Sequence, residues 1–146
     1  MKEPLKFRGY NTKRRRLITG RYLTFGGLHF IVADDVPSLA AMLEKADDYA
    51  VAPATVGMST GRTDSKGREI FEYDVLAPCR PGSRLRYAVV FDTRLSAFVV
   101  VAAGHVAGPR KSLWRLLCRT PMMVVGDITT SPEAFNAGRS ARYPPL

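Results

Sequence analysis

The sequence predicts a mainly β fold of the α+β class, made of antiparallel β hairpins and a small barrel-like meander. Polar or glycine-rich turns separate short apolar segments, as at Asp64–Gly67. Longer segments at 84–92 and 97–103 are apolar at successive positions, which is typical of central strands. Apolar residues recur at helical spacing near 38–48, and a second, shorter helix is expected near 132–137.

The chain has 146 residues, of which 46% are apolar and 24% are charged, a composition typical of a globular protein with a buried core. We expect one domain over residues 1–146. A finer division, into an N-terminal hairpin part at 1–59 and a barrel-like part at 60–137, stays open at this point.

Hairpins are expected at the start of the chain. Residues 5–10 and 16–19 form the strands of the first, joined by a turn at Asn11, whose side chain can bond its own backbone. Tyr22–Phe25 and Leu28–Val32 form the second, joined by a Gly-Gly pair that can adopt positive φ.

A helix of about three turns is predicted next, with Ser38 as its N-cap. The apolar residues expected on its buried face are Leu39, Met42, Leu43 and Ala46. Pro53 ends this part of the chain, and residues 55–59 are expected to be extended.

The stretch Thr60–Leu76, TGRTDSKGREIFEYDVL, reads as a turn that begins the meander. Asp64–Gly67 is a polar tight turn, with glycine where the backbone needs a left-handed conformation. Residues 68–72 alternate as a short strand does, and Asp74 leads into the next strand. Structural roles in this turn are therefore assigned to Asp64, Gly67, Glu72 and Asp74.

The C-terminal third contains one ambiguous segment. Residues 112–117, SLWRLL, fit a strand or a helical turn, and Trp114 within them is expected in the core. A strand is predicted at 122–128, MMVVGDI. The closing helix is expected to have Ser131 as cap, Pro132 as first residue and Gly138 after its end, followed by a frayed tail.

Three motifs, in order along the chain, resemble the YopX proteins of bacteriophages and prophages. Residues 6–11, KFRGYN, look like that family's Lys-Phe-Arg-Ala-Trp opening. Residues 51–76, VAPATVGMSTGRTDSKGREIFEYDVL, are similar to its central signature, V-x-P-E-T-V-G-Q-[YF]-T-G-L-x-D-K-N-G-K-E-I-[YF]-E-G-D-I-V. Residues 124–135, VVGDITTSPEAF, resemble its closing E-V-I-G-N-I-Y-E-N-P-E-L. The resemblance implies a mostly β fold encoded by a phage or mobile element, without an established biochemical role.

The chain departs from the family pattern at three places. Tyr73 stands where the family has a glycine, so this junction either tolerates a side chain or has a different shape. The helix near 38–48 occupies a place where many relatives have less chain, and Met58 replaces a common glutamine.

The net charge of +9 is unevenly spread. Residues 1–26 and residues 79–119 each carry eight basic residues and one acidic residue, a net charge of +7 apiece, whereas residues 34–48 carry −4. This segregation favours contact with a polyanion, and it equally fits a solvated surface that promotes solubility.

Two groups of basic residues are the candidate nucleic-acid contacts. The first is a run in the first hairpin loop: Lys13, Arg14, Arg15 and Arg16. The second flanks the 84–92 strand: Arg84, Arg86 and Arg94. Tyr10 and Tyr87 are their candidate stacking partners. Because the chain has no recognition helix or RNP-type motif, such binding is expected to be weak and sequence-tolerant.

The sequence has no evident catalytic constellation, metal site or cofactor site. His29, His105, Cys79 and Cys118 lack the spacing of metal ligands. Carboxylates around the 64–74 turn suit turn capping and ion pairs with neighbouring basic residues. A metal-dependent hydrolase that uses them is the less favoured enzymatic alternative.

We therefore expect a non-enzymatic accessory protein of phage or prophage origin, acting as a binding or assembly module, with weak nucleic-acid binding as the alternative. Strands that are apolar on both faces suggest self-association or a host or phage protein partner. No apolar run reaches the length of a membrane span, and the N-terminus has no secretory signal, so the bacterial cytoplasm is the expected location.

Overall fold

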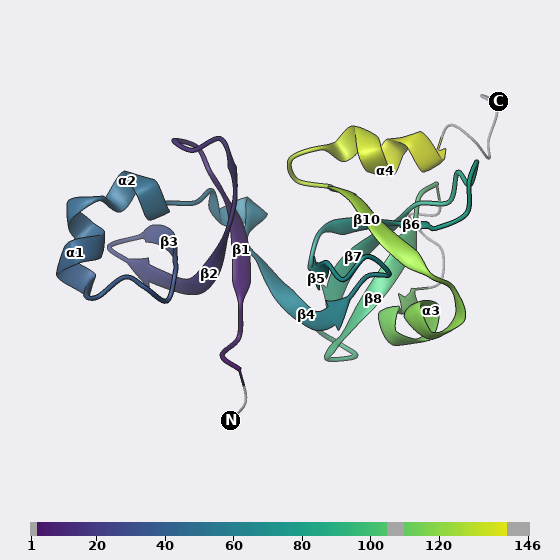
Figure 1. The fold of residues 1–146 in the computed structure, drawn as a ribbon, viewed down its shortest axis with the longest axis horizontal. Helices are drawn as coiled ribbons and strands as arrows, with labels where there is room; N and C mark the ends of the chain where they lie inside the picture. The colour runs from purple at the N-terminus through teal and green to yellow at the C-terminus, as the bar shows by residue number, and fades with distance from the viewer. Residues whose placement is uncertain (1–2, 105–109, 140–146) are drawn as a thin grey trace. The chain divides into compact units, whose positions relative to one another are not determined.

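The computed structural model describes residues 3–104 and 110–139 (Figure 1). The chain divides into two compact units, Met1–Ser59 and Thr60–Leu146. Strands arranged in two five-stranded sheets dominate the described residues, and antiparallel pairs form both sheets, which confirms the mainly β class. Among these residues, none of the helices combines the length and the apolar character that a membrane span requires.

The first unit is built on three strands that form successive antiparallel hairpins: β1 (Phe7–Asn11), β2 (Arg16–Phe25) and β3 (Leu28–Val32). The N-terminal half of β2 pairs with β1 and its C-terminal half pairs with β3. Between the halves lies Gly20, where a Cβ atom would collide with the carbonyl oxygen of Val32. The two hairpins expected from the sequence therefore share one long strand.

Helices α1 (Leu39–Glu44) and α2 (Ala46–Tyr49) replace the single three-turn helix expected near 38–48, so that prediction was wrong in its continuity. Ser38 caps α1 as expected, since its hydroxyl accepts the Ala41 N–H at 3.1 Å. Lys45 interrupts the helix at φ −124° and ψ 40°. After the interruption, Ala46 and Tyr49 pack with Met42 against Phe30 and Val32 of β3. Figure 1 shows both helices on the same side of this strand.

A 3₁₀ turn, η1 (Pro53–Thr55), follows these helices. Strand β4 (Gly57–Thr63) then begins, and its first residues, Gly57 and Met58, pair with β1. β4 continues across the boundary between the units, and β5 (Glu69–Phe71) is its other neighbour in the sheet.

The second sheet lies in the second unit and has the order β10-β6-β7-β8-β9. Its strands are β6 (Asp74–Pro78), β7 (Tyr87–Asp92), β8 (Ala97–Ala102), β9 (Lys111–Ser112) and β10 (Met122–Asp127). Strands β6 to β9 follow one another as a meander, and β10 pairs with β6. The main cluster of buried side chains in this unit consists of Ile70, Leu76, Val89, Val100, Leu113 and Met122.

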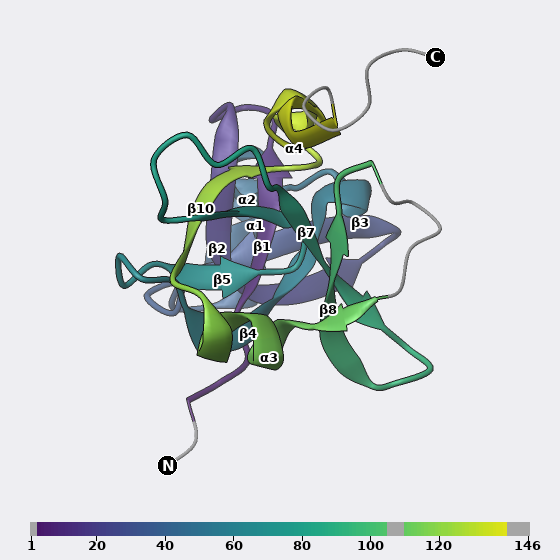
Figure 2. The ribbon, with the colours of Figure 1, turned by 90° about the vertical axis from the view of Figure 1, so that its right-hand side faces the viewer.

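Helix α3 (Leu113–Arg119) resolves the ambiguous SLWRLL segment, and it packs against β8 and β9 (Figure 2). Leu113 turns into the core, whereas Trp114 is 56% exposed, so its predicted core position was wrong. The two residues point different ways because successive helical positions differ by about 100°. The guanidinium of Arg62 lies 4.6 Å from the centre of the Trp114 ring.

Helix α4 (Pro132–Arg139) follows β10 and begins at Pro132 as expected. Gly138 lies inside this helix and not after its end, which corrects that prediction. A glycine within a helix costs only about 1 kcal/mol relative to alanine, so it does not by itself end one. The tail after Arg139, expected to be frayed, lies outside the described residues.

The Asp64 carboxylate ties the turn at 64–67 to strand β10. One of its oxygens accepts the N–H groups of Lys66 and Arg68 at 2.9 and 2.8 Å, and the other accepts the Val124 N–H at 2.9 Å. Gly67 completes the turn at φ +80°, a conformation that costs a side chain roughly 1 kcal/mol or more. One side chain thus joins segments 60 residues apart.

Tyr73 has φ +75°, although it stands where the family pattern has a glycine. Its N–H bonds the Val89 carbonyl at 2.8 Å, and its carbonyl accepts the Ile128 N–H at 2.9 Å. The junction before β6 therefore keeps a left-handed backbone and tolerates a side chain, which resolves the two alternatives left open by the sequence.

Asp64→Asn is expected to destabilise the protein by about 1–3 kcal/mol at neutral pH, because an amide NH₂ would face a buried backbone N–H. Burial alone raises the pKa of the Asp64 carboxyl, but the N–H groups of Val124, Arg68 and Lys66 outweigh it and hold the pKa below its ordinary value. The charged form therefore stabilises the native state above about pH 4, and this stabilisation is lost as the pH falls through the lowered native pKa.

Urea unfolding of both proteins across this pH range measures the effect. The difference in the free energy of unfolding between the wild type and Asp64→Asn should be largest at neutral pH and should become smaller in acid. Asp35→Asn, a change at an exposed carboxylate, serves as the control and should leave stability within about 0.5 kcal/mol. An Asp64→Asn cost that is independent of pH would contradict the role of the charge.

Candidate functional site

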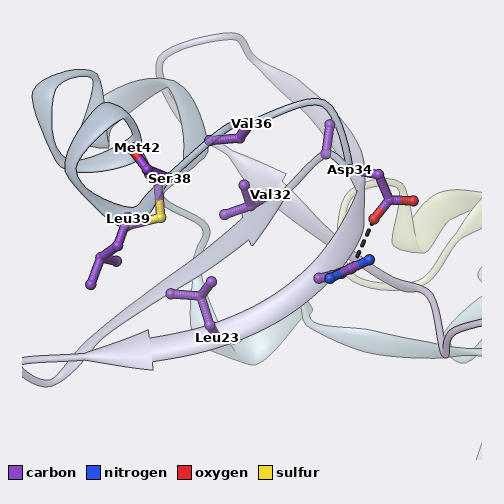
Figure 3. A pocket seen from close by; sticks show the side chains of 9 residues that line it. Leu23, Val32, Asp34, Val36, Ser38, Leu39 and Met42 are labelled. Carbon is purple, nitrogen blue, oxygen red and sulfur yellow. Dashed lines mark ion pairs between the residues drawn. The ribbon is translucent and has the colours of Figure 1, made fainter.

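A pocket of about 230 Å³ lies in the first unit, between the β2–β3 hairpin and α1 (Figure 3). Its walls are mostly apolar: Leu23, Val32, Val36, Leu39 and Met42. At one end Arg21 and Asp34 form an ion pair, with Nε and Oδ1 2.8 Å apart and both side chains about two-thirds exposed. The pocket thus has an apolar interior and one charged end.

The apolar wall continues beyond the pocket along the hairpin. In the antiparallel pairing of β2 with β3, Leu23 is the cross-strand partner of Phe30, and Phe25 is the partner of Leu28. Because alternate residues of a strand share a face, these pairs lie on the side that α1 covers. The helix covers only the inner pair: Phe30 is 1% exposed, whereas Phe25 and Leu28 are 55% and 60% exposed.

We call the surface formed by the exposed Phe25, Leu28 and Leu39, together with the partly covered Leu23 between them, the apolar strip. Leu39 is 51% exposed. It extends from α1, across from Leu23 on β2 (Figure 3). A contiguous exposed apolar surface is typical of an interaction site. Among the described residues that line the pocket, the charged side chains of Arg21 and Asp34 pair with each other, so the rest of the lining offers mainly apolar contact.

The basic run of the first hairpin loop is divided by contacts to α2. Lys13 Nζ lies 2.6 Å from Asp48 Oδ1, and the hydrogen bond raises the pKa of Lys13 and lowers that of Asp48. The Arg14 guanidinium lies 5.9 Å from the centre of the Tyr49 ring. Arg15 and Arg16 are exposed.

Asn11 holds this loop in place. Its fully buried side chain donates to the carbonyls of Asp47 and Ala50 at 3.0 and 2.8 Å, and its oxygen accepts the Arg14 N–H at 2.6 Å. The amide therefore brings the basic run beside the acidic helix, so that part of its charge is used within the protein.

The second basic group does not form one surface. Arg84 and Arg86 precede β7, whereas Arg94 follows it, so the strand separates them by roughly 20 Å. The Arg86 guanidinium donates to the carbonyls of Ser83 and Leu85 in its own loop. Tyr10 and Tyr87, the proposed stacking partners, are half-buried in their strands.

The carboxylates around the 64–74 turn accept backbone hydrogen bonds. Besides Asp64, Glu72 Oε2 accepts the Phe91 N–H at 3.1 Å, and Asp74 Oδ2 accepts the Phe71 N–H at 2.8 Å. In the described part of the chain, no group of three or more His, Cys, Asp and Glu side chains could hold a metal ion. His29 Nδ1 is bonded to the Tyr22 hydroxyl, and His105 lies outside the described residues.

The sequence patterns considered above did not predict the apolar strip. The alternation of Leu23 and Phe25 in one strand carries the signal for a shared face, and the adjacent turn places Leu28 beside Phe25. How far α1 extends over that face depends on tertiary packing, so the sequence alone could not identify the uncovered part.

Comparison with known proteins confirms the family. The family model described as YopX protein matches residues 6–136, which is most of the chain. The chain belongs to the YopX family. The crystal structure of protein EF1440 from Enterococcus faecalis is similar in fold to this YopX protein, with a TM-score of 0.56 and 19% sequence identity over 90% of this chain and 98% of that one. No curated protein matches the chain.

Alanine substitutions at Met42 and Leu39 should differ in their cost to the free energy of unfolding, because Met42 lies in the core of the first unit and Leu39 lies in the apolar strip. Met42 is 1% exposed, so Met42→Ala is expected to cost about 2–5 kcal/mol in the free energy of unfolding. Leu39→Ala should cost much less, on the order of 0.5 kcal/mol, because its side chain is half exposed. Urea unfolding measures both. Equal losses would show that Leu39 is buried and that the strip is shorter than described.

Proposed function

We propose that this YopX protein is a non-enzymatic assembly module, encoded by a phage or prophage and working in the bacterial cytoplasm, that binds a second copy of itself through the apolar strip. The observation that carries the proposal is the continuation of one apolar face from the pocket to the hairpin tip, past the edge of α1. Exposed leucine and phenylalanine side chains on one surface favour association, because burying them removes apolar area from water.

The energetics favour a reversible complex. Fully burying a leucine or phenylalanine side chain contributes about 1.5–3 kcal/mol, and the strip residues are already partly covered in the monomer. A twofold arrangement uses the strip of each copy, and together they offset the roughly 4–15 kcal/mol that association costs. We therefore expect a dimer whose population depends on concentration.

The distribution of charge supports a second copy as the occupant. Lys13 and Arg21 pair within the chain with Asp48 and Asp34. Exposed charges remain on both segments: Arg15 and Arg16 in the first hairpin, and Glu44 and Asp47 in the helices. In a twofold arrangement, the acidic helices of one copy can meet the basic hairpin of the other. Such complementarity promotes encounter and fixes orientation.

The turn carboxylates support the non-enzymatic part of the proposal, because Asp64, Glu72 and Asp74 are engaged by backbone N–H groups within the fold. Resemblance to YopX proteins of phages and prophages supports the proposed origin. A host or phage protein is the other occupant of the strip that we consider.

Sedimentation velocity over a wide concentration range tests the dimer. We expect a monomer–dimer equilibrium that shifts toward monomer in the double variant Phe25→Ser, Leu28→Ser, since both changes remove apolar area from the strip. Leu95→Ser is the matched control, because Leu95 is 63% exposed in the β7–β8 turn of the other unit. That variant should dimerise like the wild type.

A strictly monomeric wild type at every concentration would eliminate the second copy as the occupant. Equal weakening by Leu95→Ser would show that association does not use the strip.

Nucleic-acid binding is the second candidate function, favoured by one observation: Arg15 and Arg16 are exposed beside each other at the end of a hairpin. Each phosphate contact contributes about −0.9 to the slope of log affinity against log salt on duplex DNA, so two free arginines predict a slope near −2. Fluorescence polarisation with mixed-sequence duplex and single-stranded oligonucleotides measures this slope.

The double variant Arg15→Ala, Arg16→Ala should abolish most of the salt dependence. Lys13→Ala, Arg14→Ala removes the same formal charge from the same loop but acts on side chains held by α2, and it should change the slope less. Absence of binding at low salt would exclude this function.

A further inference from the structure

A second pocket, of about 370 Å³, lies in the second unit, at the C-terminal end of β6. Its polar side chains are those of Cys79, Arg80, Ser83 and Thr120. Its apolar walls are Pro78, Leu85 and Pro121. Three segments thus meet here: the end of β6, the 79–86 loop, and the connection between α3 and β10.

Backbone hydrogen bonds fix the walls of this pocket. The Cys79 N–H donates to the Pro121 carbonyl at 3.0 Å, which joins two of the segments. Within the loop, the Ser83 N–H donates to the Arg80 carbonyl at 3.1 Å. The Arg86 guanidinium closes the loop by donating to the carbonyls of Ser83 and Leu85 at 3.1 and 2.8 Å. The backbone of this loop is thus tied to its own residues and to the connection between α3 and β10 by hydrogen bonds.

Among the described residues that line the pocket, Arg80, Ser83 and Thr120 can donate hydrogen bonds and none carries a carboxylate. The Cys79 sulfur lies 2.8 Å from the Ser65 hydroxyl oxygen. The Ser83 hydroxyl oxygen accepts the Leu85 N–H at 3.4 Å, which leaves its O–H to donate. The sequence from 75 to 91 contains three arginines and no acidic residue, and Arg119 precedes the lining residue Thr120. Such a site favours an anion.

The apolar walls restrict the class of anion. Two prolines and a leucine offer apolar surface against which a flat ring can pack, and the hydroxyls of Ser83 and Thr120 can accept from sugar hydroxyl groups as well as donate. The volume lies in the lower part of the range of small-molecule sites, about 300–1,000 Å³, and it is too small for the acyl chains of a lipid. A phosphate on a nucleoside combines the required anionic end with a planar base.

We propose that this pocket binds a nucleoside monophosphate group, either free or as the terminal nucleotide of a strand. Arg80 holds the phosphate, since a planar guanidinium matches two phosphate oxygens, and the hydroxyls of Ser83 and Thr120 add donors. Pro78, Leu85 and Pro121 contact the base. This site belongs to the second unit and is independent of self-association through the apolar strip.

The Cys79 thiol provides a direct test. Cys79 and Cys118 are both free and exposed, but only Cys79 lines the pocket. Iodoacetamide labelling of both thiols is followed by peptide mass spectrometry with and without adenosine 5′-monophosphate. At about ten times the dissociation constant, occupancy should slow labelling of Cys79 about tenfold and leave Cys118 unchanged.

Three further ligands separate the sources of the phosphate. Adenosine and inorganic phosphate, at the same concentration, should protect Cys79 much less than the nucleotide does. A 5′-phosphorylated oligonucleotide that protects at lower concentration than the free nucleotide would identify a strand end as the ligand. Equal protection by inorganic phosphate would overturn the nucleoside part of the proposal.

Matched arginine variants complete the test. Arg80→Gln should abolish protection, whereas Arg94→Gln removes the same charge at the far end of β7 and should retain it. Cys79→Ser should still bind the nucleotide by calorimetry, which shows that the thiol only reports occupancy. Lack of protection by every phosphorylated nucleoside, or an equal loss in Arg94→Gln, would overturn the site.

Discussion

The second unit depends on the hydrogen bonds of one buried carboxylate. Asp64 satisfies two N–H groups of its own turn and the Val124 N–H of β10. This contact helps to hold β10 beside β6. At the end of β6, the hydrogen bond from the Cys79 N–H to the Pro121 carbonyl joins two walls of the proposed nucleotide pocket. A charged acceptor strengthens such bonds, and leaving a buried N–H unpaired costs about 1–3 kcal/mol. The turn signature of the family is therefore a long-range constraint as well as a local one.

Asn11 has the corresponding role in the first unit, because its buried amide joins the first hairpin to the acidic helix α2. This connection brings part of the basic run into contact with α2, because Lys13 pairs with Asp48 and the Arg14 guanidinium lies over the Tyr49 ring. Formal charge counted along the chain overestimates the charge that is free to meet a polyanion. Arg15 and Arg16 remain exposed for such contact.

Two features depart from the usual behaviour of residues in a folded protein: a positive φ at a residue other than glycine, and large apolar side chains exposed to solvent. Tyr73 keeps a positive φ that glycine would adopt without cost, and hydrogen bonds to Val89 and Ile128 hold it there. Phe25, Leu28 and Leu39 expose large apolar surfaces that a minimal fold would cover. Hydrogen bonds within the fold account for the left-handed backbone of Tyr73, whereas the exposed apolar side chains are the basis of the proposed self-association.

Local chemistry determined the mainly β class, the hairpin positions and the strands of the meander. Glycine pairs, polar turns and apolar runs act over a few residues, so the sequence carries them fully. The resemblance to the YopX family followed from motifs in the sequence, and the family model matches residues 6–136. Packing decided the rest. The interruption at Lys45, the exposure of Trp114 and the separation of Arg84 from Arg94 all depend on which face of an element meets another. The two pockets likewise arise where segments distant in sequence meet, and no local pattern specifies that meeting.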